Sequence, residues 1–171
     1  VLRILGALLA LLLLGAAFLV LVPLTEQADR SPAAGSADWM AGLDDAMPLN
    51  QIVLPGTHDC ATQYVDLAFF SNCQALSVAQ QLEAGTRYLD VRLGVDGHNG
   101  IFKLMHGFAS CRWDGPMPWN DLFYLDWFLT ECYQFLQDHP TETIVFAVKQ
   151  EHGEEMKRCA VKRYASANAS V

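Results

Sequence analysis

The sequence predicts an α/β fold in which helices cover a mainly parallel sheet, and three observations support this class. Short apolar runs that are typical of strands alternate with segments of helical periodicity, which favours a parallel sheet. The chain has 171 residues, enough for one ordinary domain and too few for two large ones. A long apolar segment precedes the alternating part, so we expect a hydrophobic N-terminal helix ahead of the folded domain.

This apolar segment covers residues 1–24. No charged or hydrogen-bonding side chain occurs over residues 4–24, and about 20 such residues are enough to span a bilayer as a helix. We therefore expect a transmembrane anchor here, with a cleaved signal segment and a buried soluble helix as the alternatives. Arg3 precedes the run and Glu26 follows it, so the rest of the chain would be extracytoplasmic, either membrane-anchored or secreted.

The remainder divides into a linker, a folded domain and a tail. Residues 25–38 are small and polar and include proline and glycine, which indicates a linker. The alternating strand and helix patterns occupy residues 39–151. They dissolve over residues 152–171, which we expect to be a divergent tail.

The folded domain contains four strand candidates and two helix candidates. The strands are expected at residues 52–54, 87–93, 102–105 and 144–148, and the helices at residues 74–84 and 120–137. Gly85 is a good stop for the first helix, and Pro140 lies just beyond the second.

Charge and cysteine content restrict the class of protein. The net charge of −8 argues against nucleic acid as a partner, because neutralising phosphates needs a basic surface. The five cysteines have neither a CxxC pair nor zinc-finger spacing. In an exported protein we expect one or two disulfides, with Cys60 and Cys73 the nearest pair in sequence. A catalytic cysteine is disfavoured, since nothing nearby marks an activated thiol.

Polar side chains follow the predicted strands at regular places. His58 comes after the first strand, Arg92 lies at the end of the second, His106 ends the third and Lys149 ends the fourth. The carboxyl ends of parallel strands gather on one face of an α/β barrel, where active sites are built. We therefore expect these four residues to converge.

Two histidines with two cations suit acid–base attack on a phosphate ester. One imidazole would remove a proton from the nucleophile and the other would protonate the leaving oxygen. Arg92 and Lys149 would stabilise negative charge in the transition state. Asp59 could orient one imidazole. The other three histidines have no comparable placement in the pattern; they are His98, His139 and His152.

Several motifs resemble one known family. They are Trp39-Met40 with Leu43, LPGTHD at residues 54–59, QLEAGTRYLDVRL at 81–93, MHG at 105–107 and FLQDHPTETIVFAVKQE at 135–151. Over residues 39–151 they resemble, in the family's own order, the X region of bacterial phosphatidylinositol-specific phospholipase C. PGTHD together with AGxRYxDxR is the specific part of this signal.

The resemblance implies a distorted TIM barrel and intramolecular phosphoryl transfer on a phosphoinositide or related phospholipid in a membrane. His58 would deprotonate the inositol 2-hydroxyl. His106 would protonate the diacylglycerol oxygen, with Asp59 orienting it. A cyclic inositol phosphate would form first.

The resemblance also bears on metal. Calcium-dependent phospholipases similar to this family place carboxylates where Arg92 and Lys149 stand here. Calcium needs six to eight oxygen ligands, and two fixed cations would repel it. We therefore expect no metal or other cofactor, with Arg92 in the role of the metal. Asp90 is assigned to substrate binding, although it stays open as a calcium ligand.

A full barrel of this type has eight strand–helix units and commonly ~250 residues. About four units are recognisable here, so the fold expected is a partial, truncated TIM-barrel-like phosphodiesterase fold that lacks its C-terminal half. The aspartate that supports the first histidine in the family has no counterpart. We expect the segment 37–171 alone to associate and to have little or no activity.

Two alternatives to a phosphoric diester hydrolase of the phospholipase C type stay open. The first is a truncated noncatalytic module that binds lipid headgroups or a partner. The second is a glycerophosphodiester phosphodiesterase, which usually opens with a His-Arg pair and binds metal through a Glu-x-Asp element. Asp59 after His58, and the sequence Asp90-Val91-Arg92, disfavour this second alternative.

Overall fold

The computed structural model describes residues 2–21, 37–115, 117 and 119–151. Its helices and strands are α1 (Leu2–Leu21), η1 (Trp39–Gly42), η2 (Leu49–Gln51), β1 (Gly56–Thr57), α3 (Ala68–Ser71), α4 (Val78–Glu83), β2 (Tyr88–Val95), β3 (Phe102–His106), β4 (Ala109–Ser110), α5 (Leu125–Asp138) and β5 (Val145–Gln150). The predicted tail, 152–171, and most of the predicted linker, 25–38, lie outside the described residues.

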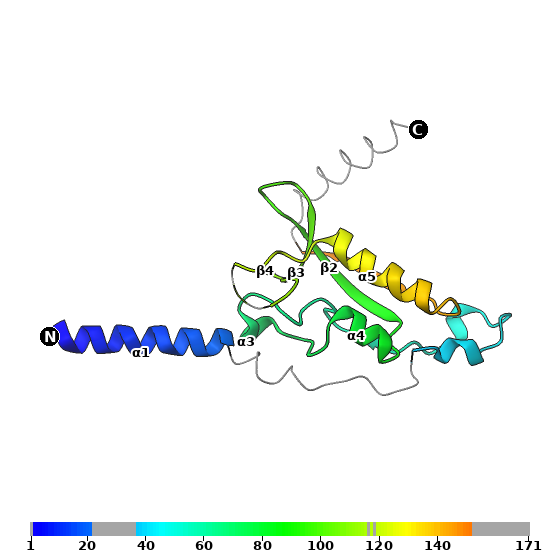
Figure 1. Cartoon of the computed structure of the whole chain (residues 1–171), viewed down its shortest axis with the longest axis horizontal. Helices are drawn as coiled ribbons and strands as arrows, with labels where there is room; N and C mark the ends of the chain where they lie inside the picture. The colour runs from blue at the N-terminus through cyan, green and yellow to red at the C-terminus, as the bar shows by residue number, and fades with distance from the viewer. Residues whose placement is uncertain (1, 22–36, 116, 118, 152–171) are drawn as a thin grey trace.

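The N-terminal helix α1 extends away from the rest of the domain, and its C-terminal end lies near α3 (Figure 1). Its leucine side chains between residues 2 and 14 are all exposed, with values from 57% for Leu5 to 87% for Leu2. Within the described part of the chain, no helix has both the length and the apolar character that a membrane crossing needs. The predicted transmembrane anchor is therefore not supported.

Strand β2 is the centre of an open five-stranded sheet. β5 pairs with it in parallel along one edge, from Tyr88 opposite Val145 to Leu93 opposite Gln150. The other edge is shared by two strands that arrive from opposite directions. β1 pairs in parallel with the start of β2, and β3 pairs antiparallel with its end.

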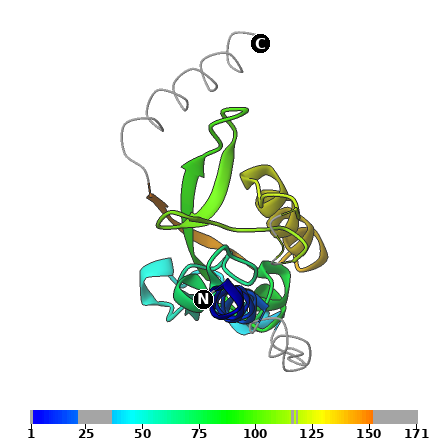
Figure 2. The ribbon, with the colours of Figure 1, turned by 90° about the vertical axis from the view of Figure 1, so that its left-hand side faces the viewer.

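The α/β class is confirmed, but the expectation of a parallel sheet is wrong for β3 and β4. Only residues 96–101 separate β2 from β3, a connection too short for the crossover helix that parallel pairing requires. The result is a hairpin that projects beyond the helices in Figure 2. The short Asp96-Gly97 turn was the sequence signal for this hairpin.

The element boundaries differ from the prediction mainly at the N-terminal ends. Residues 52–54 are not a strand, and Val53 is 90% exposed. Pairing begins instead at Pro55, whose carbonyl accepts from the amides of Arg87 and Tyr88 at 2.9 and 3.1 Å. Gly56 permits the backbone of β1 to lie close to Tyr88 of β2, because a Cβ at residue 56 would be only 3.2 Å from the Tyr88 ring.

The core lies on one face of the sheet, beneath α4 and α5. Its members from β2 are the alternate residues Leu89, Val91 and Leu93, each at most 7% exposed. They pack with Leu82 of α4 and Phe128 of α5. Burying this apolar face is what fixes the register of β2 and turns the intervening polar side chains to the opposite face.

Helix α4 is shorter than predicted because it begins at a cap. The side chain of Ser77 accepts a hydrogen bond from the backbone amide of Gln80. The side chain of Gln80 in turn accepts one from the backbone amide of Ser77. This capping box supplies partners for two amides that the helix leaves unpaired. Gly85 follows the helix with φ of 98°, as predicted for its stop.

The prediction of disulfides is wrong for the described cysteines. Cys60, Cys73, Cys111 and Cys132 are all free thiols, and Cys73 alone of these four is exposed. Cys159 lies outside the described residues. The expected Cys60–Cys73 bridge is absent because Cys60 is buried in the core while Cys73 faces the histidines described below.

Candidate active site

His58 and His106 meet beside the middle of β2. β1 ends just before His58 and runs with β2, whereas β3 ends at His106 and runs against it. The two strands therefore approach each other head-on along one edge of β2, between Leu89 and Leu93. The predicted convergence of the histidines is confirmed, although its cause is this head-on approach rather than a row of parallel strand ends.

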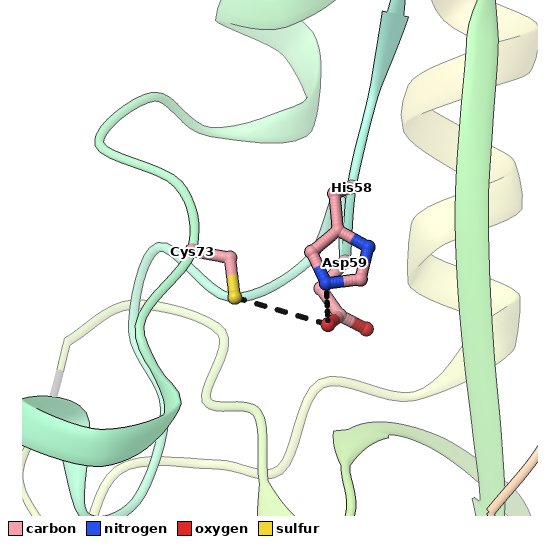
Figure 3. Close-up of side chains that lie close together, drawn as sticks. All are labelled: His58, Asp59 and Cys73. Atoms are coloured by element: carbon pink, nitrogen blue, oxygen red, sulfur yellow. Dashed lines mark hydrogen bonds and ion pairs between the residues drawn. The ribbon is translucent and has the colours of Figure 1, made fainter.

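A left-handed residue brings His58 and Asp59 into the same site. Neighbouring side chains of an extended strand point to opposite faces. Asp59 has φ of 47°, a conformation uncommon outside glycine, and this turn carries its carboxylate back to the imidazole. Oδ2 of Asp59 lies 3.0 Å from Nε2 of His58 (Figure 3).

The other nitrogen of His58 faces a different carboxylate. Nδ1 lies 3.0 Å from Oδ2 of Asp90, a residue on the polar face of β2. Burial raises the pKa of Asp90, but hydrogen bonds from Arg92 and from the Asp59 amide outweigh it, so the pKa is below the usual range. Asp90 is therefore ionised near neutral pH and can accept a hydrogen bond from Nδ1–H of His58.

His106 is held by the turn that follows it. It pairs with Ala109 across a two-residue turn, whose first residue, Gly107, has φ of 56°. Nδ1 of His106 lies 2.8 Å from the carbonyl oxygen of Ser71, which can only accept. Nε2 therefore carries the lone pair of the neutral ring, and it lies 3.4 Å from Oδ2 of Asp59. The two imidazole ring centroids are 6.3 Å apart.

Arg92 links three carboxylates beneath the histidines. Its guanidinium lies 2.6 Å from Oδ1 of Asp59, 3.0 Å from Oδ2 of Asp90 and 3.1 Å from Oε1 of Glu151. The hydrogen bonds that Arg92 donates to Asp90, and then to Glu151, raise the pKa of Arg92 although burial lowers it, so the group stays charged. Burial raises the pKa of Glu151, but Lys149 and Arg92 outweigh it and the pKa is lowered.

Lys149 lies beside Arg92 on the neighbouring strand, as the register of β2 and β5 pairs the two residues. Its side chain is 56% exposed, and Nζ lies 3.1 Å from Oε1 of Glu151. The structure thus brings together all six predicted site residues. His98 donates its backbone amide to Asp96 in a turn, and His139 pairs with Asp38; neither contacts this cluster.

Three residues of the cluster were not assigned from the sequence. Glu151 was not among the predicted site residues, and it binds both Lys149 and Arg92. Ser71 offers only a backbone carbonyl, which no residue pattern marks. Cys73 places its thiol 3.8 Å from Oδ2 of Asp59 (Figure 3) and 3.8 Å from Nδ1 of His106. Cys73 reaches the site through a loop, so strand periodicity carried no signal for it.

The carboxylates also bear on calcium. Calcium takes six to eight oxygen ligands. The three carboxylates of this cluster, from Asp59, Asp90 and Glu151, all contact the Arg92 guanidinium, whose charge opposes a hard cation. Asp90 also contacts His58, so each of these three carboxylates already has a charged or titratable partner in the described structure.

A cavity of about 540 Å³ lies elsewhere, between α4 and α5. Two tryptophans, Trp113 and Trp127, and the carboxyl group of Glu131 are part of its lining. None of the predicted site residues lines it. We place the chemistry at the histidines, because that cluster contains the paired titratable groups and the cavity does not.

Comparison with known proteins identifies what the chain is similar to. No family model matches the sequence. A 1-phosphatidylinositol phosphodiesterase of Listeria monocytogenes is 34% identical over 120 residues, which make up 66% of this chain and 32% of that protein. The human PI-PLC X domain-containing protein 2 is 29% identical over 141 residues, 64% of this chain and 42% of that protein. The chain thus spans well under half the length of these relatives.

The fold gives the same result. The solved structure of the phosphatidylinositol-specific phospholipase C from Listeria monocytogenes matches with a TM-score of 0.56 and 26% identity, over 78% of this chain and 46% of that one. The resemblance that the motifs indicated is confirmed. By sequence and by fold, the chain is a relative of the phosphatidylinositol-specific phospholipases C.

Proposed function

We propose that this chain takes part in cleaving the phosphodiester of a phosphatidylinositol-type lipid, with His58 and His106 as the acid–base pair. One observation carries the proposal: the Nε2 atoms of both histidines face the same oxygen of Asp59, while each Nδ1 is held by a separate acceptor. Proton transfer at a phosphate ester needs two imidazoles that are fixed in orientation and point to the same place. The activity named for the Listeria relative supports the same chemistry.

The proposed reaction is a displacement at phosphorus. Nε2 of His58 takes the proton of the inositol 2-hydroxyl, and that oxygen forms a bond to phosphorus. The bond between phosphorus and the diacylglycerol oxygen breaks, and Nε2 of protonated His106 gives its proton to that oxygen. A cyclic inositol phosphate and diacylglycerol leave.

The carboxylates have separate parts in this scheme. Asp90 accepts from Nδ1–H of His58 and stabilises the imidazolium that forms. This contact takes the place of the supporting aspartate that the sequence lacked. Asp59 lies within reach of protonated His106 and orients it, as proposed from the sequence. Asp59 also contacts His58 in the substrate-free site, so substrate must displace that contact.

Positive charge for the phosphate comes from Arg92 and Lys149. Arg92 can present its guanidinium to two phosphate oxygens at once, a geometry that lysine cannot reproduce. Lys149, at the exposed end of the cluster, is proposed to contact the headgroup. No metal is assigned a part in this mechanism.

Aromatic side chains beside the histidines fit a lipid substrate. Phe69, Phe70 and Phe108 are 64%, 77% and 75% exposed. Phe69 and Phe70 belong to α3, whose last residue, Ser71, binds His106, and Phe108 lies two residues after His106. Exposed aromatic clusters of this kind mark membrane or protein contact sites. We propose that they meet the lipid surface.

The open sheet supports a partial barrel. Phe146 and Val148 of β5 share the face of Leu89 and Val91 by register, yet they are 38% and 62% exposed. In the described part of the chain, Phe146 is covered only in part, by the Phe128 ring with centroids 5.5 Å apart, and Val148 stays largely open to solvent. We propose that the sheet forms the first part of a barrel, whose further strand–helix units would cover this apolar strip. We also propose that the domain is secreted.

The test is ³¹P NMR of phosphatidylinositol micelles with the full chain. We expect slow formation of a cyclic inositol phosphate, and a rate about 10²–10⁴-fold lower for His58→Ala and for His106→Ala. His98→Ala is the matched control, since His98 lies in a turn away from the cluster. Binding without cleavage would favour the noncatalytic module and overturn the proposal, as would wild-type turnover by either histidine variant.

A further inference from the structure

The thiol of Cys73 lies beside the histidines, and the proposed acid–base chemistry gives it no role. The preceding residue, Asn72, fixes the loop. Its Nδ2 donates to the carbonyl oxygens of Thr62, Gln63 and Gln74 at 2.8, 2.9 and 3.1 Å. The backbone amide of Cys73 donates to Oγ1 of Thr62 at 3.1 Å. The loop thus holds Cys73 in place.

Three different donor atoms converge at this point. Nε2 of His58, Oδ2 of Asp59 and Sγ of Cys73 all lie within 4.8 Å of one another (Figure 3). Oδ2 is 3.0 Å from the nitrogen and 3.8 Å from the sulfur. Tetrahedral zinc, with bonds of about 2.0–2.3 Å, puts neighbouring donors roughly 3.3–3.8 Å apart. The cluster is therefore close to the size of a zinc site.

Other contacts prepare these atoms to act as ligands. Asp90 accepts from Nδ1–H of His58, which leaves the Nε2 lone pair directed at the cluster. Arg92 holds the other oxygen of Asp59, at 2.6 Å, so Oδ2 is the oxygen that stays available. Outer contacts of this kind fix the orientation of metal ligands in known sites.

We propose that His58, Asp59 and Cys73 bind one divalent ion of the zinc class, with water in a fourth position that faces His106. Thiolate and imidazole donors select zinc over calcium or magnesium, which prefer oxygen. On binding, Sγ forms a bond to the metal and its proton goes to solvent. The thiolate and the carboxylates of Asp59 and Asp90 offset the charge of the metal and Arg92.

The site has a consequence for activity, which rests on the proposed function. A metal on Nε2 of His58 occupies the lone pair that would accept the substrate proton. Zinc therefore blocks cleavage and competes with the lipid headgroup for the same space. The proposed metal site would thus inhibit the enzyme rather than supply its cofactor.

The first test titrates Co²⁺ into the full chain in reducing, chelator-free buffer and records its visible and ultraviolet absorption. We expect one equivalent to give tetrahedral Co²⁺ bands and a thiolate-to-cobalt charge-transfer band, which Zn²⁺ abolishes. Cys73→Ser should remove the charge-transfer band and weaken zinc binding at least tenfold. Cys159→Ser is the matched control and should change neither. Loss of the band in Cys159→Ser and not in Cys73→Ser would overturn the proposal.

A second measurement needs no variant. Cys73 is the exposed thiol among the four described cysteines, so iodoacetamide should label it before Cys60, Cys111 and Cys132, as mapped by mass spectrometry. Zinc should slow labelling of Cys73 at least tenfold, and an unchanged rate would contradict the site.

Cleavage is measured separately, first with chelator and then with zinc. We expect zinc to inhibit, and Cys73→Ser to need at least tenfold more zinc for the same inhibition. Cleavage by a chain that fails to bind Co²⁺ or Zn²⁺ would overturn the metal site alone. A chain that binds metal but never cleaves would overturn the proposed function alone.

Discussion

Two arginines, one just before β2 and one within it, both pair with carboxylates, and they differ in what surrounds the pair. Arg87, just before β2, is 0% exposed and lies 2.7 Å from Oε2 of Glu142. Its other N–H groups donate to backbone carbonyls of Ala37, Leu82 and Thr86. Every described contact of Arg87 is internal, so its position is structural.

Arg92 has similar partners in a different setting. Its side chain is 15% exposed, and one of its nitrogens lies 3.4 Å from Nδ1 of His58, which is 62% exposed. The carboxylates around Arg92 thus border an open site, whereas Glu142 is closed off from solvent. An arginine–carboxylate pair alone does not indicate function; access of a ligand to the pair does.

Removing Arg87 should give the largest effect. Arg87→Ala leaves the buried Glu142 carboxylate without its cation and removes the guanidinium that lies 4.6 Å from the Phe135 ring. Breaking a buried pair in this way costs about 3–5 kcal/mol of unfolding free energy. Urea denaturation followed by circular dichroism measures it, with the exposed Arg3→Ala as the control. A loss below ~1 kcal/mol would mean that the Arg87–Glu142 pair stabilises the fold no more than an exposed ion pair does.

Removing Arg92 should affect activity rather than folding. Arg92→Ala is expected to lower kcat for diester cleavage about 10²–10³-fold, because the phosphate loses its two-point cation. Arg92→Lys should recover only part of this loss, since ammonium lacks the planar fork. Kinetics and a urea transition are measured on the same samples. If Arg92→Ala were destabilised as much as Arg87→Ala and kept the wild-type kcat, Arg92 would have a structural role and no catalytic one.

Asp90 should show a smaller effect through His58. Asp90→Asn keeps the size of the side chain and removes the charge that stabilises the imidazolium. We expect kcat to fall about 10–10²-fold with KM nearly unchanged, and Asp90→Glu to recover part of the loss. Steady-state kinetics on soluble substrate decides between this and a packing role, in which KM and the melting temperature would change and kcat would not.

Glu131 should give the smallest effect, on stability alone. Burial raises the pKa of Glu131 to about 7, so the folded chain holds a proton that the unfolded chain has lost. Its contribution to stability is present below an unfolded pKa of about 4.5 and is lost as pH rises through about 7. Glu131→Gln should therefore flatten the decline of the melting temperature over this range. An identical decline in both proteins would contradict the buried carboxyl group.

The sequence alone was enough to predict the strands at the centre of the sheet. The alternation of apolar and polar residues placed β2, β3 and β5 within a few residues, because a half-buried strand imposes that period. It also marked His58, Arg92 and His106 at strand ends. The direction of β3 was missed because strand periodicity is the same for either direction.

The rest of the site depends on contacts that sequence periodicity does not report. The left-handed turn at Asp59 is what lets one carboxylate reach both histidines. The pairing of Asp90 with His58 follows from the register of β1 on β2, and Cys73 arrives through a loop fixed by Asn72. Each is a long-range contact, set by packing rather than by local pattern.

The assignment of His58 as base and His106 as acid is tested most directly by changing the leaving group. Cleavage of inositol 4-nitrophenyl phosphate releases a stable anion that needs no proton. This substrate therefore makes the general acid unnecessary but still requires the general base. We predict that the loss of kcat in His106→Ala becomes small with this substrate, whereas His58→Ala stays impaired about 10²-fold or more. Equal losses for His106→Ala on both substrates, or recovery of His58→Ala instead, would contradict the account.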